Sequence, residues 1–149
     1  MRKYITSLLV VSGLALSSAT TVLAQKKSSL YDNLGGKKAI TAVVDEFVGR
    51  VAADNRINAF FKQTASDPKR LASFKAKLVD QICEASGGPC KYKGKSMKAA
   101  HMGMGISGAD FGALVEDLVG ALDKFKVKEA DKNALLGVLG PMKSDIVEK

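Results

Sequence analysis

Apolar residues recur at helical spacing along most of this chain, and this periodicity limits its fold more than any other feature. The clearest case lies between Lys38 and Ala53, where apolar side chains recur three or four positions apart. These are Ile40, Val43, Val44, Phe47, Val48 and Val51. Such spacing places them on one wide face of an α-helix, and the sequence lacks the alternation of period two that is typical of strands. We therefore predict an all-α domain.

Helix start and stop signals divide the first half of the chain. A short helix is expected over Leu30–Leu34, because Gly35-Gly36 is a typical helix stop. Asp67 followed by Pro68 is typical of an N-cap and the first helical residue. The helix that begins there is expected to carry an apolar stripe and to end at Gly87-Gly88. The stripe comprises Leu71, Phe74, Leu78 and Ile82.

Two further helices are expected in the second half. Ser107 and Asp110 have the spacing of a capping box, which predicts a helix start just before a run of apolar residues. A last helix over about residues 129–147 would be kinked at Gly140-Pro141, because proline lacks the amide N–H that a helix interior needs. Residues 89–105 show little regular pattern.

The first 24 residues have the order of a secretory signal. A basic head precedes the apolar run Leu8–Leu16, and a small residue, Ala24, stands just before Gln25. A membrane anchor needs about 20 continuous apolar residues, and the polar run Ser17–Thr21 interrupts this one. We expect cleavage after Ala24, a domain over residues 25–149, and export to the periplasm or the medium without a stable membrane anchor.

Basic residues exceed acidic ones, which raises the question of an anionic partner. The formal charge of +8 falls to +6 when Arg2 and Lys3 leave with the signal. The lysines are interleaved with acids, and no basic patch with aromatic residues stands out. The charge therefore favours a solvated surface over a nucleic-acid interface.

Cys83 and Cys90 are the only cysteines, and they form neither a C-x-x-C nor a C-x-x-C-H motif. Gly87-Gly88-Pro89 lies between them and allows the chain to turn back. Outside the cytoplasm such a pair can form a disulfide. The sequence favours this disulfide modestly over two buried free thiols.

His101 is the only histidine, so the sequence excludes multi-histidine zinc sites. It lies among methionines and small residues, beside a glycine-rich stretch. A neutral imidazole in an apolar slot is what a five-coordinate haem iron requires. On these residues alone, haem ligation and an ordinary core or surface histidine both remain open.

The segment Tyr92-Lys93-Gly94-Lys95-Ser96-Met97 followed by His101 resembles the tyrosine, glycine, methionine and proximal-histidine motif of the group I truncated haemoglobins. Further motifs match in the same order along the chain. They are Leu30–Gly36, Phe47 with Arg50-Val51, Phe60-Phe61, Gly87-Gly88-Pro89, Ile106 and Phe111. The resemblance thus covers nearly all of residues 30–147.

This resemblance implies a two-over-two helical sandwich around one non-covalent haem b. His101 would bind the iron, and a backbone carbonyl or a water would orient its other ring nitrogen. Phe61 would pack on the porphyrin, and Lys77 or Lys95 would reach a propionate. The full set of implied haem contacts is Phe61, Phe74, Lys77, Leu78, Lys95, Met97, His101, Ile106 and Leu114.

The chain departs from the family on the distal side. Where the family commonly has a tyrosine that donates to bound oxygen, this chain has Val48. The implied distal pocket, which is mostly apolar, comprises Val48, Phe60, Phe74, Leu78, Gln81 and Ile82. Gln81 is the one candidate donor, and its alternative role is that of a solvent-facing helix residue.

These observations favour a monomeric globin that binds oxygen, nitric oxide or carbon monoxide reversibly. The alternative is a haem enzyme for nitric oxide dioxygenation or peroxide reduction. An enzyme of that kind needs a polar distal network and a reductant, and the sequence identifies neither a clear network nor a redox partner.

Overall fold

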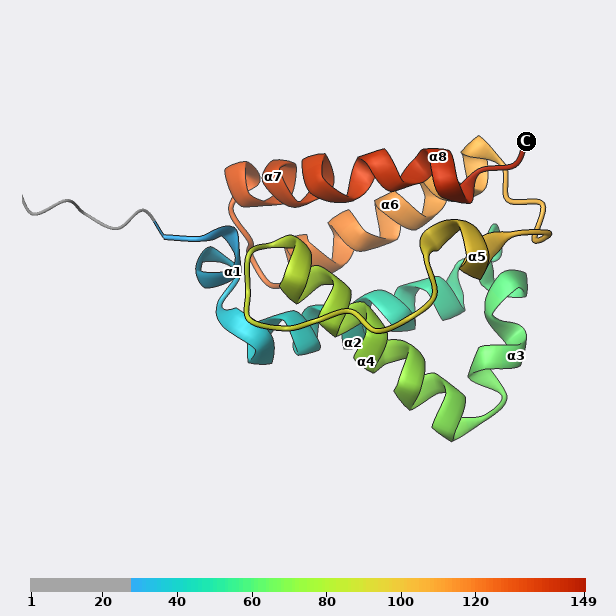
Figure 1. Ribbon diagram of the computed structural model, residues 1–149, viewed down its shortest axis with the longest axis horizontal. Coiled ribbons are helices and arrows are strands. Elements are labelled where there is room, and N and C mark those ends of the chain that lie inside the picture. Colours follow the sequence, from blue (N-terminus) through green and yellow to red (C-terminus); the bar gives the residue numbers. More distant parts are fainter. Residues whose placement is uncertain (1–27) are drawn as a thin grey trace, which may run out of the picture.

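The computed structural model describes residues 28–149, and these residues form helices joined by short loops, with no strand among them (Figure 1). The α-helices are α1 (Leu30–Asn33), α2 (Gly36–Ala53), α3 (Lys62–Ala65), α4 (Pro68–Ala85), α5 (Met97–His101), α6 (Gly108–Lys124), α7 (Glu129–Leu139) and α8 (Lys143–Ile146). Two 3-10 turns, η1 (Asn58–Phe61) and η2 (Gly140–Met142), lie between helices. The predicted all-α class is confirmed. The expected signal segment, residues 1–24, lies outside the described residues.

The helices form two layers. In Figure 1, α6 and the α7–α8 pair lie above α2 and α4. Helix α2 packs against both α4 and α6, so it joins the two layers. The chain between α4 and α5 runs along the front of the lower layer, and α5 lies at the same end as α8. The arrangement agrees with the expected two-over-two sandwich.

Side-chain caps fix the starts of the two long helices α4 and α6. Asp67 accepts hydrogen bonds from the amides of Lys69, at 2.8 Å, and Arg70, and Pro68 is the first residue of α4. At α6 the hydroxyl of Ser107 accepts from the Asp110 amide, and the Asp110 carboxylate accepts from the Ser107 amide at 2.8 Å. These caps satisfy amides that have no partner within the helix. Both predicted helix starts are confirmed.

The core lies where α2, α4 and α6 meet. Val44, Cys83 and Ala121 are fully enclosed, and Leu122 is almost so. The stripe expected on α2 is buried except for Val48, which is half-buried.

The stripe expected on α4 is only partly correct. The residues of this helix that are buried in the core are Val79, Ile82 and Cys83. Leu71, Phe74 and Leu78 are half-buried. The Phe74 ring packs instead on Phe61, with ring centroids 5.8 Å apart. Leu78 nevertheless packs against the core cluster, so the stripe faces the core although Ile82 is its one buried residue.

The last helix is broken at the predicted place. α7 ends at Leu139, the turn η2 contains Pro141, and α8 begins at Lys143. Proline removes one amide donor from the helix, so the chain passes through a tighter turn there. Among the helices of residues 28–149, none is both long enough and apolar enough to span a bilayer.

Candidate functional site

His101 is the last residue of α5, a helix of only five residues. Ser96 caps this helix by accepting from the Ala99 amide. The Nδ1 atom of His101 lies 2.7 Å from the carbonyl oxygen of Met97. A carbonyl only accepts, so Nδ1 donates this bond, and in the neutral ring the lone pair then lies on Nε2. The ring is half-buried and held in one tautomer, which is the state a metal ligand needs.

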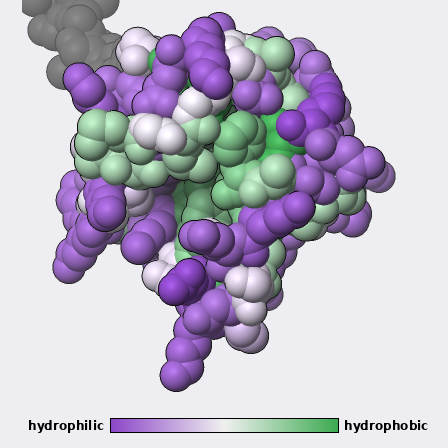
Figure 2. Space-filling view, turned by 90° about the vertical axis from the view of Figure 1, so that its right-hand side faces the viewer, coloured by the Kyte–Doolittle hydropathy of each residue, from purple (hydrophilic) through white to green (hydrophobic). Residues whose placement is uncertain are grey.

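The end of the molecule that carries α3, α5 and α8 has an apolar hollow. Figure 2 shows this face, with apolar residues gathered around the hollow and hydrophilic side chains surrounding them. Among the candidate site residues, most keep part of their surface exposed although they are apolar. Half-buried members are Val48, Phe60, Phe61, Phe74, Leu78, Met97 and Leu114, whereas Ile82 and Ile106 are buried.

Several apolar site residues from different elements pack against one common core cluster. Val48 from α2, Leu78 from α4 and Leu114 from α6 all pack against the same core cluster. Phe60 and Phe61 join it from η1. The structure therefore brings together side chains that lie far apart in the sequence, and all of these side chains are hydrocarbon.

Gln81 packs against two methionines. It is half-buried, and its Nε2 lies 3.3 Å from the sulfur of Met97 and 3.2 Å from the sulfur of Met142. It is therefore not a solvent-facing residue, and its amide is engaged on the side of α5 and η2. The role of Met142 was not predicted, because 61 positions separate it from Gln81 and no local pattern connects the two.

The two lysines assigned to an anionic group of the cofactor are both exposed. Lys77 lies on α4 and Lys95 on the loop before α5. Within the described residues neither forms an ion pair. Tyr92 shapes this loop, because its hydroxyl donates to the Lys95 carbonyl at 2.8 Å.

A disulfide joins the end of α4 to the loop that leads to α5. The sulfur atoms of Cys83 and Cys90 are 2.05 Å apart. The turn between them needs glycine at position 88, since a Cβ there would come within 2.5 Å of the Tyr31 ring and 2.7 Å of the Cys83 sulfur. The Gly88 amide also donates to the Cys83 carbonyl at 2.8 Å.

Carboxylates bind the loops on both sides of α5. The Glu84 carboxylate accepts from the Tyr92 amide at 2.9 Å, and this bond, with Lys91 nearby, lowers the pKa of Glu84. The Glu148 carboxylate accepts from the amides of Gly103 and Gly105, which lower the pKa of Glu148. Neither carboxylate was singled out from the sequence.

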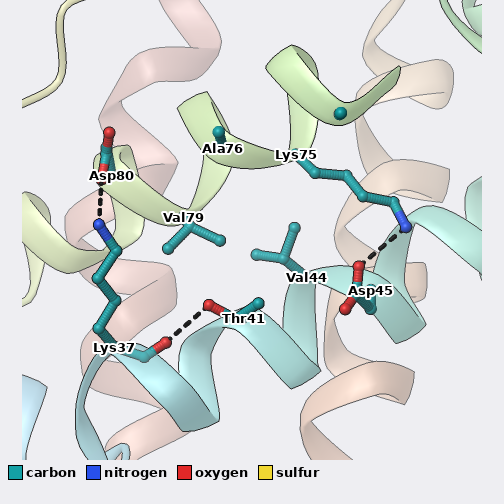
Figure 3. Close-up of a pocket in the computed structure, with 9 residues that line it drawn as sticks. Lys37, Thr41, Val44, Asp45, Lys75, Ala76, Val79 and Asp80 are labelled. Carbon is teal, nitrogen blue, oxygen red and sulfur yellow. Dashed lines mark hydrogen bonds and ion pairs between the residues drawn. The ribbon is translucent and has the colours of Figure 1, made fainter. Parts of the chain in front are cut away.

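A groove of about 390 Å³ opens between α2 and α4, away from the candidate site. Its apolar lining includes Val44 and Val79 (Figure 3). Two ion pairs lie beside it: Lys37 with Asp80, at 3.0 Å, and Lys75 with Asp45, at 2.8 Å. None of the residues predicted to contact a cofactor lines this groove.

Comparison with known proteins places the whole helical region in one group of relatives. Residues 29–148 match the family model of the bacterial-like globins. The group 1 truncated haemoglobin of Tetrahymena pyriformis is 35% identical over 126 residues, which cover 83% of this chain and 98% of the relative.

Two solved structures have the same arrangement of helices. The Fe(III) form of the Tetrahymena pyriformis truncated haemoglobin superposes with a TM-score of 0.74 at 32% identity, over 82% of this chain and all of that one. The two-over-two haemoglobin of a Synechococcus species, in the cyanomet state and with covalently attached haem, gives 0.73 at 32% identity over the same shares. The range matched by the family model includes α5.

Proposed function

This chain belongs to the bacterial-like globins, and among them to the group 1 truncated haemoglobins, and from this we propose that it binds one haem b through His101 and holds a diatomic gas reversibly at the iron. The family implies a haem that binds ligands. Bound haem supplies an iron with one open coordination position, and the chain supplies the fifth ligand and the surroundings of the sixth.

The observation that carries the proposal is the orientation of His101. Its Nδ1 donates to the Met97 carbonyl at 2.7 Å, which leaves Nε2 as the only nitrogen free to bind iron. A second-sphere carbonyl of this kind fixes the tautomer and raises the basicity of the ligand. The half-buried phenylalanines of η1 and α4 offer flat apolar contacts for a porphyrin.

We infer that the haem is held without a covalent bond. One solved relative carries covalently attached haem. In this chain both cysteines form the disulfide, and the C-x-x-C-H motif that attaches haem through thioethers is missing from the sequence. The one histidine is the proposed ligand itself.

The surroundings of the sixth position favour reversible binding over catalysis. The side chains assigned to the distal side are apolar apart from Gln81, whose amide is engaged with two sulfur atoms. Dioxygenation of nitric oxide or reduction of peroxide needs polar groups that hold and polarise the bound oxygen. We therefore favour a carrier or sensor of oxygen, nitric oxide or carbon monoxide over an enzyme.

An absorption spectrum tests this proposal directly. The chain is expressed with haem, beside His101→Ala, and spectra are recorded in the ferric, ferrous and carbon monoxide forms. We expect a Soret band that shifts on reduction and on carbon monoxide binding in the wild type, and a band that is lost or altered in the variant. Circular dichroism shows whether the variant keeps its helices. A helical wild-type chain that takes up no haem would refute the proposal.

We also propose that the chain works outside the cytoplasm, as a monomer released from its signal. The Cys83–Cys90 disulfide supports this, because such bonds persist in oxidising compartments. Mass spectrometry of the chain from fractionated cells should find an N-terminus at Gln25 in the periplasm or the medium. A full-length cytosolic chain with two free thiols would contradict the export proposal and would leave haem binding unaffected.

A further inference from the structure

The segment that follows α8 crosses back to the loop that follows α5. The two carboxylate oxygens of Glu148 accept the amides of Gly103, at 2.6 Å, and Gly105, at 2.5 Å. The Glu148 amide donates to the Ile106 carbonyl at 2.8 Å, and the Lys149 amide donates to the same oxygen at 3.3 Å. In Figure 1 the end of the chain lies on the same side of the molecule as α5. The loop after α5 is thus clamped through both backbone and side chain.

The loop after α5 is intrinsically flexible, so it needs contacts that hold it in place. Gly103 and Gly105 have φ of 80° and 65°, in the left-handed region. Glycine loses more conformational freedom on ordering than any other residue, so an unclamped loop of this kind stays mobile. Helix α5 has only five residues, too few to be stable without outside contacts.

The clamp acts directly next to His101. The Met104 amide donates to the His101 carbonyl at 3.1 Å, which closes the turn at the end of α5. Gly103 and Gly105 flank Met104, so the two oxygens of Glu148 hold the backbone on both sides of that turn. Hydrogen bonds from amides to an ionised carboxylate are shorter and stronger than neutral ones.

We propose that Glu148 is a positioning residue for the proximal ligand: it fixes the backbone that follows His101, holds the imidazole at one distance and orientation, and thereby slows haem loss. This inference rests on the proposed role of His101. Glu148 does not touch the cofactor in this account, and acts only through the loop at residues 102–107.

The test compares Glu148→Gln with Asp145→Asn in the full haem-loaded chain. Asp145 lies three residues earlier, is exposed, and makes no side-chain bond within the described residues, so D145N removes the same charge without touching the loop. Haem dissociation is measured by transfer to excess apomyoglobin, and the iron–histidine stretching band by resonance Raman spectroscopy of the ferrous form. Hydrogen exchange at Gly103 and Gly105 reports on the loop.

We expect E148Q to release haem roughly five- to tenfold faster, because one charged acceptor is lost and two amides are weakened. Its iron–histidine band should shift or broaden, its two glycine amides should exchange faster, and D145N should match the wild type in all three. Faster exchange in E148Q with an unchanged dissociation rate and an unchanged band would reduce Glu148 to a structural role and overturn the proposal.

A variant that fails to fold and a wild-type chain that binds no haem have different meanings. If E148Q does not fold, Glu148→Asp takes its place, since its carboxylate is drawn back by one methylene and reaches the two amides less well. Haem loss from E148D that is no faster than from D145N would then overturn the proposal. A wild-type chain that takes up no haem would instead refute the proposed function.

Discussion

In the proposed haem site, we expect Val48 to influence ligand choice more than any other single residue. A tyrosine hydroxyl commonly donates to bound oxygen at this position in the family that the sequence resembles, and valine has no donor. We expect no donor from Gln81 either, because its amide lies against the sulfur atoms of Met97 and Met142. A gas bound at the iron would therefore meet hydrocarbon, which weakens oxygen binding more than carbon monoxide binding, because bound oxygen carries more negative charge.

Val48→Tyr tests this account. A hydrogen bond to a charged acceptor contributes about 1–3 kcal/mol, so the oxygen dissociation rate should fall about ten- to a hundredfold. Carbon monoxide dissociation should change much less. Stopped-flow measurement gives both rates, and Val48→Phe is the control, with the same ring and no hydroxyl. If V48F slows oxygen release as much as V48Y does, the effect is steric and the account is wrong.

Asp117 is a second residue with an unusual environment. Its Oδ2 atom is buried and has no hydrogen-bond partner within the described residues. Burial, aided by the charge of Asp54, raises the pKa of Asp117. The ionised carboxylate therefore opposes folding at neutral pH, and this cost disappears as the pH falls through the raised pKa toward the ordinary value of 3.8.

Asp117→Asn should accordingly stabilise the chain. We expect the free energy of unfolding at neutral pH to rise by up to about 1 kcal/mol, and the gain to vanish below about pH 3.8. Urea unfolding at several pH values measures it. Glu116→Gln is the control, since it removes the same charge from the exposed neighbour that pairs with Arg56. A loss of stability in D117N at neutral pH would show that the carboxylate has a favourable partner.

Among the helices, the long ones and their caps could be predicted from the sequence, whereas the short helix α5 could not. The capping side chains of α4 and α6 lie within three residues of the amides they satisfy, so the pattern is local. Helix α5 lies in the stretch that showed little pattern. The loops on its two sides are held by a carboxylate from α4, a carboxylate from the end of the chain and the disulfide, and all of these groups lie outside the helix itself.

The disulfide should contribute to the stability of this part of the fold. It closes a short loop, from Cys83 to Cys90, between α4 and the segment that leads to α5. Replacing both cysteines with alanine should lower the free energy of unfolding by about 2–3 kcal/mol, mainly because the unfolded chain gains freedom. Urea unfolding measures the loss. The wild type in reducing agent should approach the variant, and equal stability with and without reductant would contradict the prediction.

For the whole molecule, the periodicity of apolar residues was enough to predict the class, and the ordered motifs were enough to predict the two-layer arrangement. The same pattern did not separate Ile82, the buried residue of the α4 stripe, from the three half-buried ones, because periodicity shows which face is apolar and not how fully it is covered. Gln81 and Glu148 were harder still. The partners of Gln81 lie 16 and 61 positions away and those of Glu148 lie 43 and 45 positions away, and only the folded chain brings them together.

The distribution of charge also sets how the molecule responds to acid. Several carboxylates have a pKa below the ordinary value because cations, a hydroxyl or amides bind the ionised form, namely Glu46, Asp54, Glu84, Asp110 and Glu148. A pKa lowered in the folded chain contributes stability that is complete above the unfolded value, and the contribution is lost as the pH falls through the folded value. The unfolded values are 4.5 for glutamate and 3.8 for aspartate.

We therefore expect thermal stability to be nearly level from neutral pH to about pH 5, and then to fall steeply below pH 4.5. The midpoint of thermal unfolding, followed by circular dichroism at half-unit steps of pH, measures this. The double variant with Glu84→Gln and Glu148→Gln should start lower at neutral pH and decline less steeply, since two of the groups no longer titrate, whereas D145N should follow the wild type. Asp117 works in the opposite direction, so D117N should steepen the fall. A wild-type midpoint that stays constant down to pH 3 would mean that these hydrogen bonds contribute nothing to stability.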